Sequence, residues 1–197
     1  MKHVVIVDSG GANLASLQFA LTRLGAQSAV SADAAVIRAA PRVILPGVGS
    51  ARNAMARLSA AGLDAVLPTL DQPVLGICLG MQLLCDFSEE GDTACLGIIP
   101  ARVTRLVSTS ELPVPHMGWN TLREREDDPL LAGIGDRDYV YFVHGFAVVP
   151  NPATLAATEY GTSLSAVVRQ RNFWGTQFHP ERSGQPGARI LGNFLCC

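Results

Sequence analysis

The chain has 197 residues, of which 48% are hydrophobic and 16% are charged, and its formal net charge is −2. This length and composition predict a single domain, residues 1–197, with a sizeable buried core. The charge balance supplies neither a basic nucleic-acid-binding surface nor a polybasic membrane patch, so we expect no partner of either kind. The five cysteines are an odd number and lack C-x-x-C or zinc-site spacing, which predicts a reduced, cytoplasmic protein without a bound metal.

No segment has the pattern of a signal peptide or a membrane span. The apolar run Val4–Val7 is too short for either and is followed at once by Asp8. The stretch 139–158 lacks Asp, Glu, Lys and Arg, but it contains Pro150 and Pro152, which break a spanning helix. We therefore expect a soluble protein.

The first half of the chain alternates strand and helix patterns. Runs of β-branched and other apolar residues predict strands, whereas apolar residues at helical spacing predict helices. In chain order we expect strands at 4–7, 26–30, 43–45 and 74–77, and helices at 13–24 and 50–61. Asn13 is the expected N-cap of the first helix, and Gly25 and Gly62 end the two helices. Repeated β-α units predict a parallel sheet with right-handed crossovers.

The second half changes character toward strands joined by short turns. The expected strands are 101–107, 139–143, 154–160, 164–169 and 173–177, followed by a closing helix at 186–195. We interpret the charged stretch 123–128 as a solvated loop. The predicted fold class is α/β, with a mainly parallel central sheet, helices on both faces and added antiparallel strands. Ligands of such sheets bind at the carboxyl ends of the strands.

The strongest functional signal is Cys78, within Gly76-Ile77-Cys78-Leu79-Gly80. The motif lies between the strand at 74–77 and a helix-like stretch at 81–86, the setting of a nucleophile elbow. A Cβ at either flanking glycine would crowd such a turn, and glycine tolerates the unusual φ and ψ that the turn needs. On the same helix, Cys85 is expected two turns further on, packed in the core.

Downstream, the sequence offers partners for this thiol in His179 and Glu181. A lone cysteine is more often a buried structural thiol, but the elbow together with His-x-Glu favours a nucleophilic triad. His179 would take the thiol proton and Glu181 would orient the imidazole. The backbone N–H of Leu79 is one expected oxyanion donor, and the turn 46–49 is a candidate for the second.

Four separated motifs carry a resemblance to a known family. Residues 45–49, 76–82, 143–146 and 177–181 resemble, in the same order, the class I glutamine amidotransferases. The resemblance implies a flavodoxin-like fold and a glutaminase in which Cys78 attacks the glutamine carboxamide, ammonia leaves, and water hydrolyses the thioester; it implies no cofactor. The glutamine-binding positions that it implies are Gly47, Gly49, Leu79, Gln82, Gly145 and Phe146.

The segment Pro115–Asn120 narrows the resemblance to the glutaminase subunits of imidazole glycerol phosphate synthases, in histidine biosynthesis, as do 8–14 and 160–161. That family implies a heterodimer with a (β/α)8 cyclase, which receives the ammonia through its barrel and makes imidazole glycerol phosphate and aminoimidazole-carboxamide ribotide. The implied interface residues are Asn13, Trp119, Asn120 and Arg182.

The chain departs from this family's usual residues at the docking face and in the glutamine pocket. The departures are Ser9, Ala12, Pro113, Gly145-Phe146 and Arg182. Two alternatives stay open: the glutaminase of a pyridoxal phosphate or anthranilate synthase, and a non-catalytic module that senses oxidation through Cys78. The segment 116–120 argues against the first, and Gln82 with the His179-Glu181 pair argues against the second.

Overall fold

The structure is a computed structural model that describes residues 2–9, 14–123 and 125–197. Its helices and 3-10 turns are α1 (Leu14–Arg23), α2 (Ala34–Ala39), α3 (Ala51–Ala60), α4 (Leu63–Val66), η1 (Leu67–Thr69), α5 (Leu79–Leu83), η2 (Pro129–Leu131), η3 (Pro180–Arg182) and α6 (Gly184–Phe194). Its strands are β1 (Lys2–Val7), β2 (Ala26–Ser31), β3 (Val43–Gly47), β4 (Val74–Cys78), β5 (Cys85–Ser88), β6 (Thr93–Ala94), β7 (Ile99–Arg105), β8 (His116–Thr121), β9 (Tyr139–His144), β10 (Phe146–Val148), β11 (Thr154–Glu159), β12 (Ser163–Gln170) and β13 (Phe173–Thr176).

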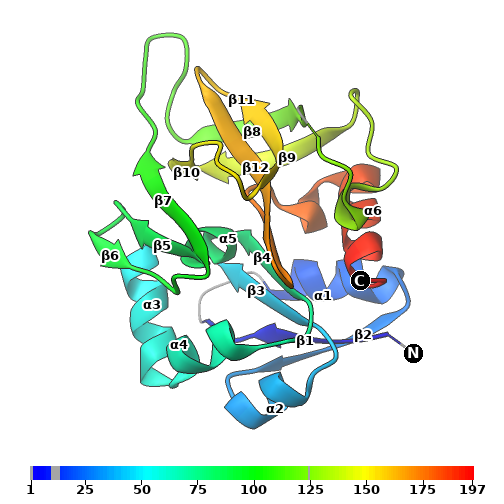
Figure 1. Cartoon of the computed structure of the whole chain (residues 1–197). Coiled ribbons are helices and arrows are strands. Elements are labelled where there is room, and N and C mark those ends of the chain that lie inside the picture. The colour runs from blue at the N-terminus through cyan, green and yellow to red at the C-terminus, as the bar shows by residue number, and fades with distance from the viewer. Residues whose placement is uncertain (1, 10–13, 124) are drawn as a thin grey trace.

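The centre of the molecule is a seven-stranded sheet in the order β11-β12-β13-β4-β3-β1-β2 (Figure 1). The five strands from β13 to β2 are parallel, and β12 and β11 extend the β13 edge in antiparallel fashion. In chain order the parallel strands run 2-1-3-4-5, the doubly wound order of flavodoxin-like folds. The predicted α/β class with added antiparallel strands is confirmed.

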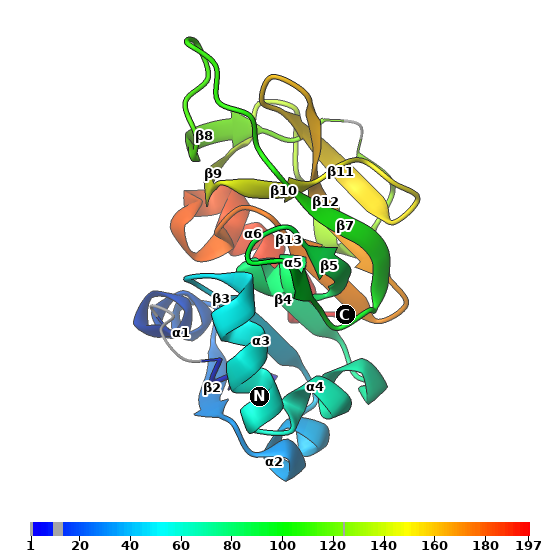
Figure 2. The same cartoon turned by 90° about the vertical axis from the view of Figure 1, so that its left-hand side faces the viewer.

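Helices cover both faces of this sheet, because alternate residues of its central strands point to opposite sides. In β1, Val4 and Ile6 belong to a core that also contains residues of α1 and α6. Val5 and Val7 belong to the opposite core, with residues of α2, α3 and α4. Figures 1 and 2 show these helices on their respective sides of the sheet. Burial on both faces explains the continuous apolar character of the strand sequences.

Two smaller sheets extend these cores. The four-stranded sheet β10-β7-β5-β6 adds Cys85, Ile99 and Val103 to the core beside α3 and α5. The hairpin-like pair β8-β9 adds Val140 and Phe142 to the core beside α6. The strand β8, at the segment that narrowed the family resemblance, was not predicted from the sequence.

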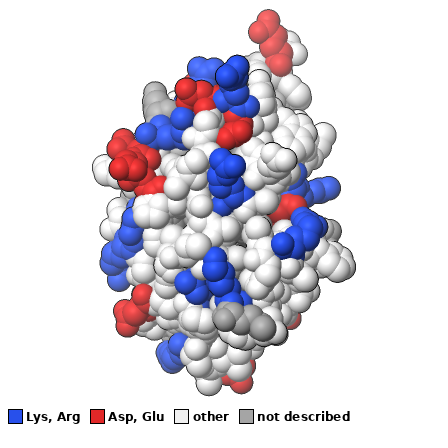
Figure 3. All heavy atoms as spheres, turned by 90° about the vertical axis from the view of Figure 1, so that its right-hand side faces the viewer, with Lys and Arg blue, Asp and Glu red and all other residues white. Residues whose placement is uncertain are grey.

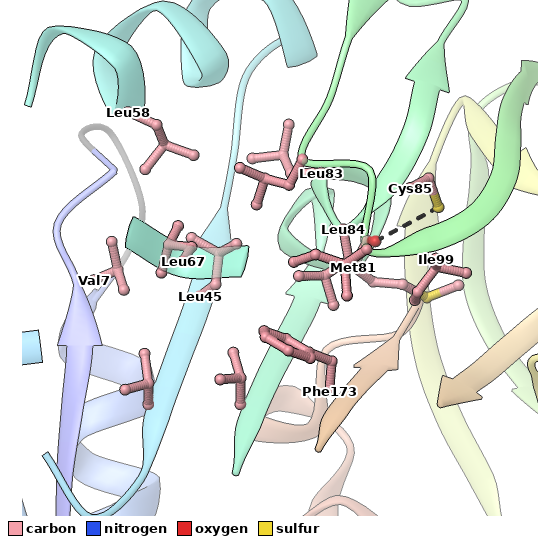
Figure 4. Close-up of a cluster of buried hydrophobic side chains, with 14 of the residues drawn as sticks. Val7, Leu45, Leu58, Leu67, Met81, Leu83, Leu84, Cys85, Ile99 and Phe173 are labelled. Carbon is pink, nitrogen blue, oxygen red and sulfur yellow. Dashed lines mark hydrogen bonds between the residues drawn. The ribbon is translucent and has the colours of Figure 1, made fainter. Parts of the chain in front are cut away.

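The helix after Cys78 is shorter than predicted. It ends at Leu83, and Cys85 begins strand β5 instead of lying on a second helical turn. The physical reason is that residues 96–99 satisfy the carbonyl groups of residues 83–85, in place of the next helical turn. Cys85 is nevertheless buried, as expected, and its thiol points at the carbonyl oxygen of Met81, 3.9 Å away (Figure 4).

The interpretation of 123–128 as a solvated loop is wrong at both ends. The backbone of Arg123 exchanges two hydrogen bonds with Ala157, so it extends the sheet edge at β11. Asp128 is buried because its carboxylate accepts a 2.7 Å bond from Arg169 and a 3.1 Å bond from the indole N–H of Trp174. Opposite charge and three donors, the third being the backbone N–H of Leu130 at 2.8 Å, make burial of this carboxylate tolerable.

The remaining predicted elements shift only at their ends. The N-cap predicted at Asn13 lies outside the described residues, and the helix is observed from Leu14. The closing helix begins at Gly184 and is 11 residues long. Among the residues that the structure describes, no helix is long and apolar enough to cross a membrane. On the face drawn in Figure 3, Lys and Arg side chains are interspersed with Asp, Glu and uncharged residues.

Candidate active site

The nucleophile elbow is built at the junction of β4 and α5. Cys78 is the last residue of β4 and the N-cap of α5, with φ 52° and ψ −111°. A positive φ is uncommon for a residue with a side chain and marks local backbone strain. This conformation places the thiol at the N-terminus of α5, on the wall of a pocket that His179 also lines.

The glycines around Cys78 are required for space. A Cβ on Gly80 would lie 1.8 Å from the carbonyl oxygen of Leu45 in β3, and one on Gly76 would lie 2.7 Å from the carbonyl oxygen of Gly80. The predicted crowding is therefore confirmed. The unusual φ, however, belongs to Cys78 itself rather than to either flanking glycine. The elbow packs against β3 so closely that only glycine fits.

The second candidate catalytic residue, His179, follows the carboxyl end of β13 and lies on the same pocket wall as Cys78. Its imidazole interacts with the Cys78 thiol, and Nδ1 of His179 lies 2.8 Å from Glu181 Oε1. Because a carboxylate only accepts, Nδ1 carries the proton, which leaves Nε2 for the sulfur. The His179 backbone is fixed by donation from its N–H to the Tyr141 carbonyl and by acceptance from the Ser183 hydroxyl, at 2.9 and 2.6 Å.

Two opposing effects act on the pKa of His179. Burial alone would lower it, but the hydrogen bonds with Cys78 and Glu181 and their charges raise it to about 10. The imidazolium is thus the favoured form at neutral pH. The thiolate is the nucleophilic form of cysteine, and His179 is the group placed to take the thiol proton. The other carboxylate oxygen of Glu181 is buried and accepts no hydrogen bond from the described residues.

A pocket of about 310 Å³ opens in front of Cys78 and brings the predicted positions together. Its lining includes both Cys78 and His179 and all six positions that the resemblance implies for glutamine: Gly47, Gly49, Leu79, Gln82, Gly145 and Phe146. It also includes Glu90, which the sequence analysis missed. The Glu90 carboxylate accepts a 2.8 Å bond from the backbone N–H of Ala51. A pair of acidic residues in a turn gives no sequence signal for such a position.

Gln82 is held in place by the segment opposite the elbow. Its amide nitrogen donates to the Phe146 carbonyl at 2.8 Å and to the side-chain oxygen of Gln177 at 3.0 Å. The amide nitrogen of Gln177 in turn points at the Cys78 sulfur, 3.8 Å away. Gln177 belongs to the 177–181 motif, but the sequence alone predicts no role for its side chain.

A second, apolar cavity of about 150 Å³ adjoins the pocket on the far side of His179. The two cavities share Gly47, Val48, Val143 and His179 as lining residues. The second cavity extends between Leu14 and Arg182. It therefore lies between the candidate catalytic groups and the surface that carries Arg182.

Of the predicted interface residues that the structure describes, Arg182 lines this second cavity. Trp119 is 55% exposed and packs edge-on against Tyr141, whose ring also contacts the Arg182 guanidinium at 5.4 Å. Asn120 differs, because its side chain donates to the Glu159 carbonyl at 2.8 Å. Asn13 lies outside the described residues. Within residues 2–9, 14–123 and 125–197, no group of three or more His, Cys, Asp or Glu side chains is placed to hold a metal.

The model of the family "Glutamine amidotransferase class-I" matches residues 5–196 of the chain. The chain therefore belongs to the class I glutamine amidotransferases. Two solved structures share the fold: one described as a glutamine amidotransferase, with a TM-score of 0.74 and 20% identity over 98% of this chain and 96% of that one, and PurLQS from Thermotoga maritima, with a TM-score of 0.73 and 19% identity over 100% and 99%.

Two curated relatives are similar over nearly their full length. Both are named imidazole glycerol phosphate synthase subunit HisH. The protein from Xylella fastidiosa is 51% identical over 195 residues, covering 99% of this chain and 98% of the relative. The protein from Idiomarina loihiensis is 53% identical over 193 residues, covering 98% and 97%. These relatives confirm the narrower resemblance that the segment Pro115–Asn120 indicated.

Proposed function

We propose that this chain is the glutaminase subunit of an imidazole glycerol phosphate synthase and acts as one amidotransferase domain, residues 1–197. The observation that carries the proposal is the 310 Å³ pocket, because Cys78 and His179 face it together with all six implied glutamine positions. The HisH relatives support this function over glutaminases of pyridoxal phosphate or anthranilate synthases. All five cysteines are free thiols, which is consistent with a cytoplasmic location.

In the proposed reaction, the Cys78 thiolate attacks the carboxamide carbon of glutamine. The oxyanion that forms accepts a hydrogen bond from the backbone N–H of Leu79 and a second one from the 47–49 turn. His179 donates its proton to the amide nitrogen, the C–N bond breaks, and ammonia leaves. Neutral His179 then takes a proton from water, which attacks the thioester, and glutamate departs as the thiolate is restored. Glu181 keeps the imidazole oriented in both steps.

The ammonia is proposed to serve a (β/α)8 cyclase that docks over the second cavity. That cavity begins at His179, where ammonia is released, and reaches Arg182 at the surface. Trp119 provides exposed aromatic area beside it, and aromatic residues are enriched at protein interfaces. In the heterodimer the cyclase would combine ammonia with its phosphoribulosyl substrate to give imidazole glycerol phosphate, a lyase-type reaction for which this chain supplies only the nitrogen.

The test is steady-state glutamate formation by the chain, alone and with the cyclase and its nucleotide ligand. We expect hydrolysis by the wild-type complex and none by Cys78→Ala. The matched control is Cys85→Ala, which removes a buried thiol of the neighbouring strand and should retain activity. Equal activity of the wild type and Cys78→Ala would rule out the proposed chemistry.

A further inference from the structure

Two buried histidines have no part in the proposed reaction: His144 lines the glutamine pocket, and His116 stands behind it. His116 on β8 and His144 on β9 are paired across the two strands. Their side chains are buried, and Nδ1 of His116 lies 3.1 Å from Nε2 of His144. On the other side of its ring, Nδ1 of His144 lies 2.9 Å from the carbonyl oxygen of Phe146.

These contacts define a single direction for the protons. A carbonyl oxygen only accepts, so Nδ1 of His144 must carry a hydrogen. When the His144 ring is neutral, its Nε2 carries no hydrogen and accepts a hydrogen bond, which Nδ1 of His116 donates. The result is a chain of donors that runs from His116 to His144 to the Phe146 carbonyl. A proton on Nε2 of His144 would face the His116 donor and break the chain.

The surroundings keep both rings neutral. Burial lowers the pKa of His116 to about 4. It also lowers the pKa of His144 to about 3, although the Phe146 carbonyl opposes that effect. The ring of His116 is stacked between Phe142 and Tyr160, with centroid distances of 4.7 and 4.0 Å. Such an aromatic sandwich offers little solvation to a charged imidazole.

This series of hydrogen bonds ends at the Phe146 carbonyl, which also takes part in the glutamine pocket. The Phe146 carbonyl also accepts the 2.8 Å bond from the Gln82 amide nitrogen. One oxygen therefore receives two donors, one from the histidine chain and one from a candidate glutamine-binding side chain. Since a carbonyl oxygen has two lone pairs, both are engaged and the peptide plane has one preferred orientation.

We propose that His116 and His144 are positioning residues for glutamine binding, acting as a one-way hydrogen-bond relay that fixes the Phe146 carbonyl and, through it, Gln82. The inference rests on the proposed function. Its effect is mainly on substrate affinity, since the hydrogen bonds of the relay lead to the Phe146 carbonyl and Gln82 and not to Cys78 or His179. Loss of the relay removes one of the two hydrogen bonds that orient the carbonyl of the 146–147 peptide, and so loosens the geometry that Gln82 depends on.

The first test separates hydrogen bonding from packing with two variants of one residue. His116→Phe keeps an aromatic ring between Phe142 and Tyr160 but removes the donor. His116→Asn removes the ring but keeps an amide N–H close to the position of Nδ1. In the complex with cyclase and its nucleotide ligand, we expect His116→Phe to raise KM for glutamine about 10-fold with a smaller change in kcat, the effect of one unsatisfied buried acceptor. His116→Asn should keep KM closer to the wild-type value.

Unchanged KM in His116→Phe, or a larger KM increase in His116→Asn than in His116→Phe, would overturn the relay and leave packing as the role of His116. A wild-type complex that does not hydrolyse glutamine would instead refute the proposed function. The two failures are therefore distinct.

A second measurement uses the wild-type protein, so it does not depend on whether a variant folds. The chain has only four histidines, so their ring nitrogens can be assigned by ¹⁵N NMR of the labelled protein at pH 7. We expect His116 and His144 to be neutral, each with its hydrogen on Nδ1. An Nε2–H tautomer or an imidazolium at either position would contradict the relay.

Discussion

Among the five cysteines, Cys78 alone combines a strained backbone, a pocket and an imidazole. Burial raises the pKa of Cys85 to about 12 and that of Cys95 to about 11, so these thiols stay protonated and unreactive at neutral pH. We predict that a glutamine-analogue electrophile labels Cys78 only. Mass spectrometry of the digested protein checks this. Labelling that persists in Cys78→Ala would refute the assignment of the nucleophile.

His179 and Glu181 are expected to contribute unequally. In the proposed reaction His179 moves the proton in both steps, whereas Glu181 only orients the ring through its 2.8 Å contact. We predict that His179→Gln lowers kcat for glutamine hydrolysis about 10- to 100-fold further than Glu181→Gln does. Equal losses in the two variants would show that Glu181 does more than orient the imidazole.

The same contacts link His179 to the pH dependence of stability. Its pKa in the folded protein, about 10, exceeds the ordinary value of 6.5, so the folded state binds this proton more tightly. The stabilisation is complete below pH 6.5 and is lost as pH rises through 10. We predict that the free energy of unfolding in urea falls less between pH 7 and 9.5 in His179→Gln than in the wild type. Parallel pH profiles would contradict this assignment.

At the scale of elements, the elbow depends on close contact between α5 and β3. A methyl group on Gly80 would meet the Leu45 carbonyl, and neither backbone can yield without disturbing the sheet. We predict that Gly80→Ala destabilises the protein by about 3 kcal/mol or more. The matched control is Gly192→Ala in α6, where a Cβ meets nothing within 4 Å and should leave stability unchanged or slightly higher. Urea unfolding of both variants measures the difference.

How far the sequence predicts these elements depends on which contacts form them. The first β-α units were predicted because β1, β3 and β4 are buried on both faces and α1 and α3 are amphipathic, which are local patterns. The helix after Cys78 was predicted too long, because the backbone of 96–99 ends it and no local pattern shows that contact. Asp128 was missed for the same reason, since its partners Arg169 and Trp174 are distant in the sequence.

In the whole molecule, the contrast between local patterns and long-range contacts also explains which site residues the sequence predicts. Cys78, His179 and Glu181 could be predicted as catalytic residues because short motifs contain them. Glu90, Ser183 and Tyr141 were not, because only the fold brings them to the pocket or to the His179 backbone. The roles assigned to Gly47 through Phe146 came from the family resemblance rather than from residue chemistry.

Coupling to the cyclase is expected at the 47–49 turn. Gly47 is fixed by pairing with Cys78 and has no room for a Cβ, whereas Gly49 has φ 88° and open space around it. We predict that the peptide before Gly49 supplies its oxyanion N–H only when the cyclase is docked, so the isolated chain hydrolyses glutamine about 100- to 1000-fold more slowly than the complex. Equal kcat values for the two forms would show a preformed oxyanion hole.

If this chain supplies ammonia to a synthase, the synthase should depend on it only when glutamine is the nitrogen source. Imidazole glycerol phosphate formation by the chain with its cyclase is measured with glutamine or with ammonium salt as the only nitrogen donor. We predict that Cys78→Ala abolishes synthesis from glutamine and leaves synthesis from ammonium intact. Synthesis from glutamine that survives in Cys78→Ala, or that needs no added chain, would contradict the account.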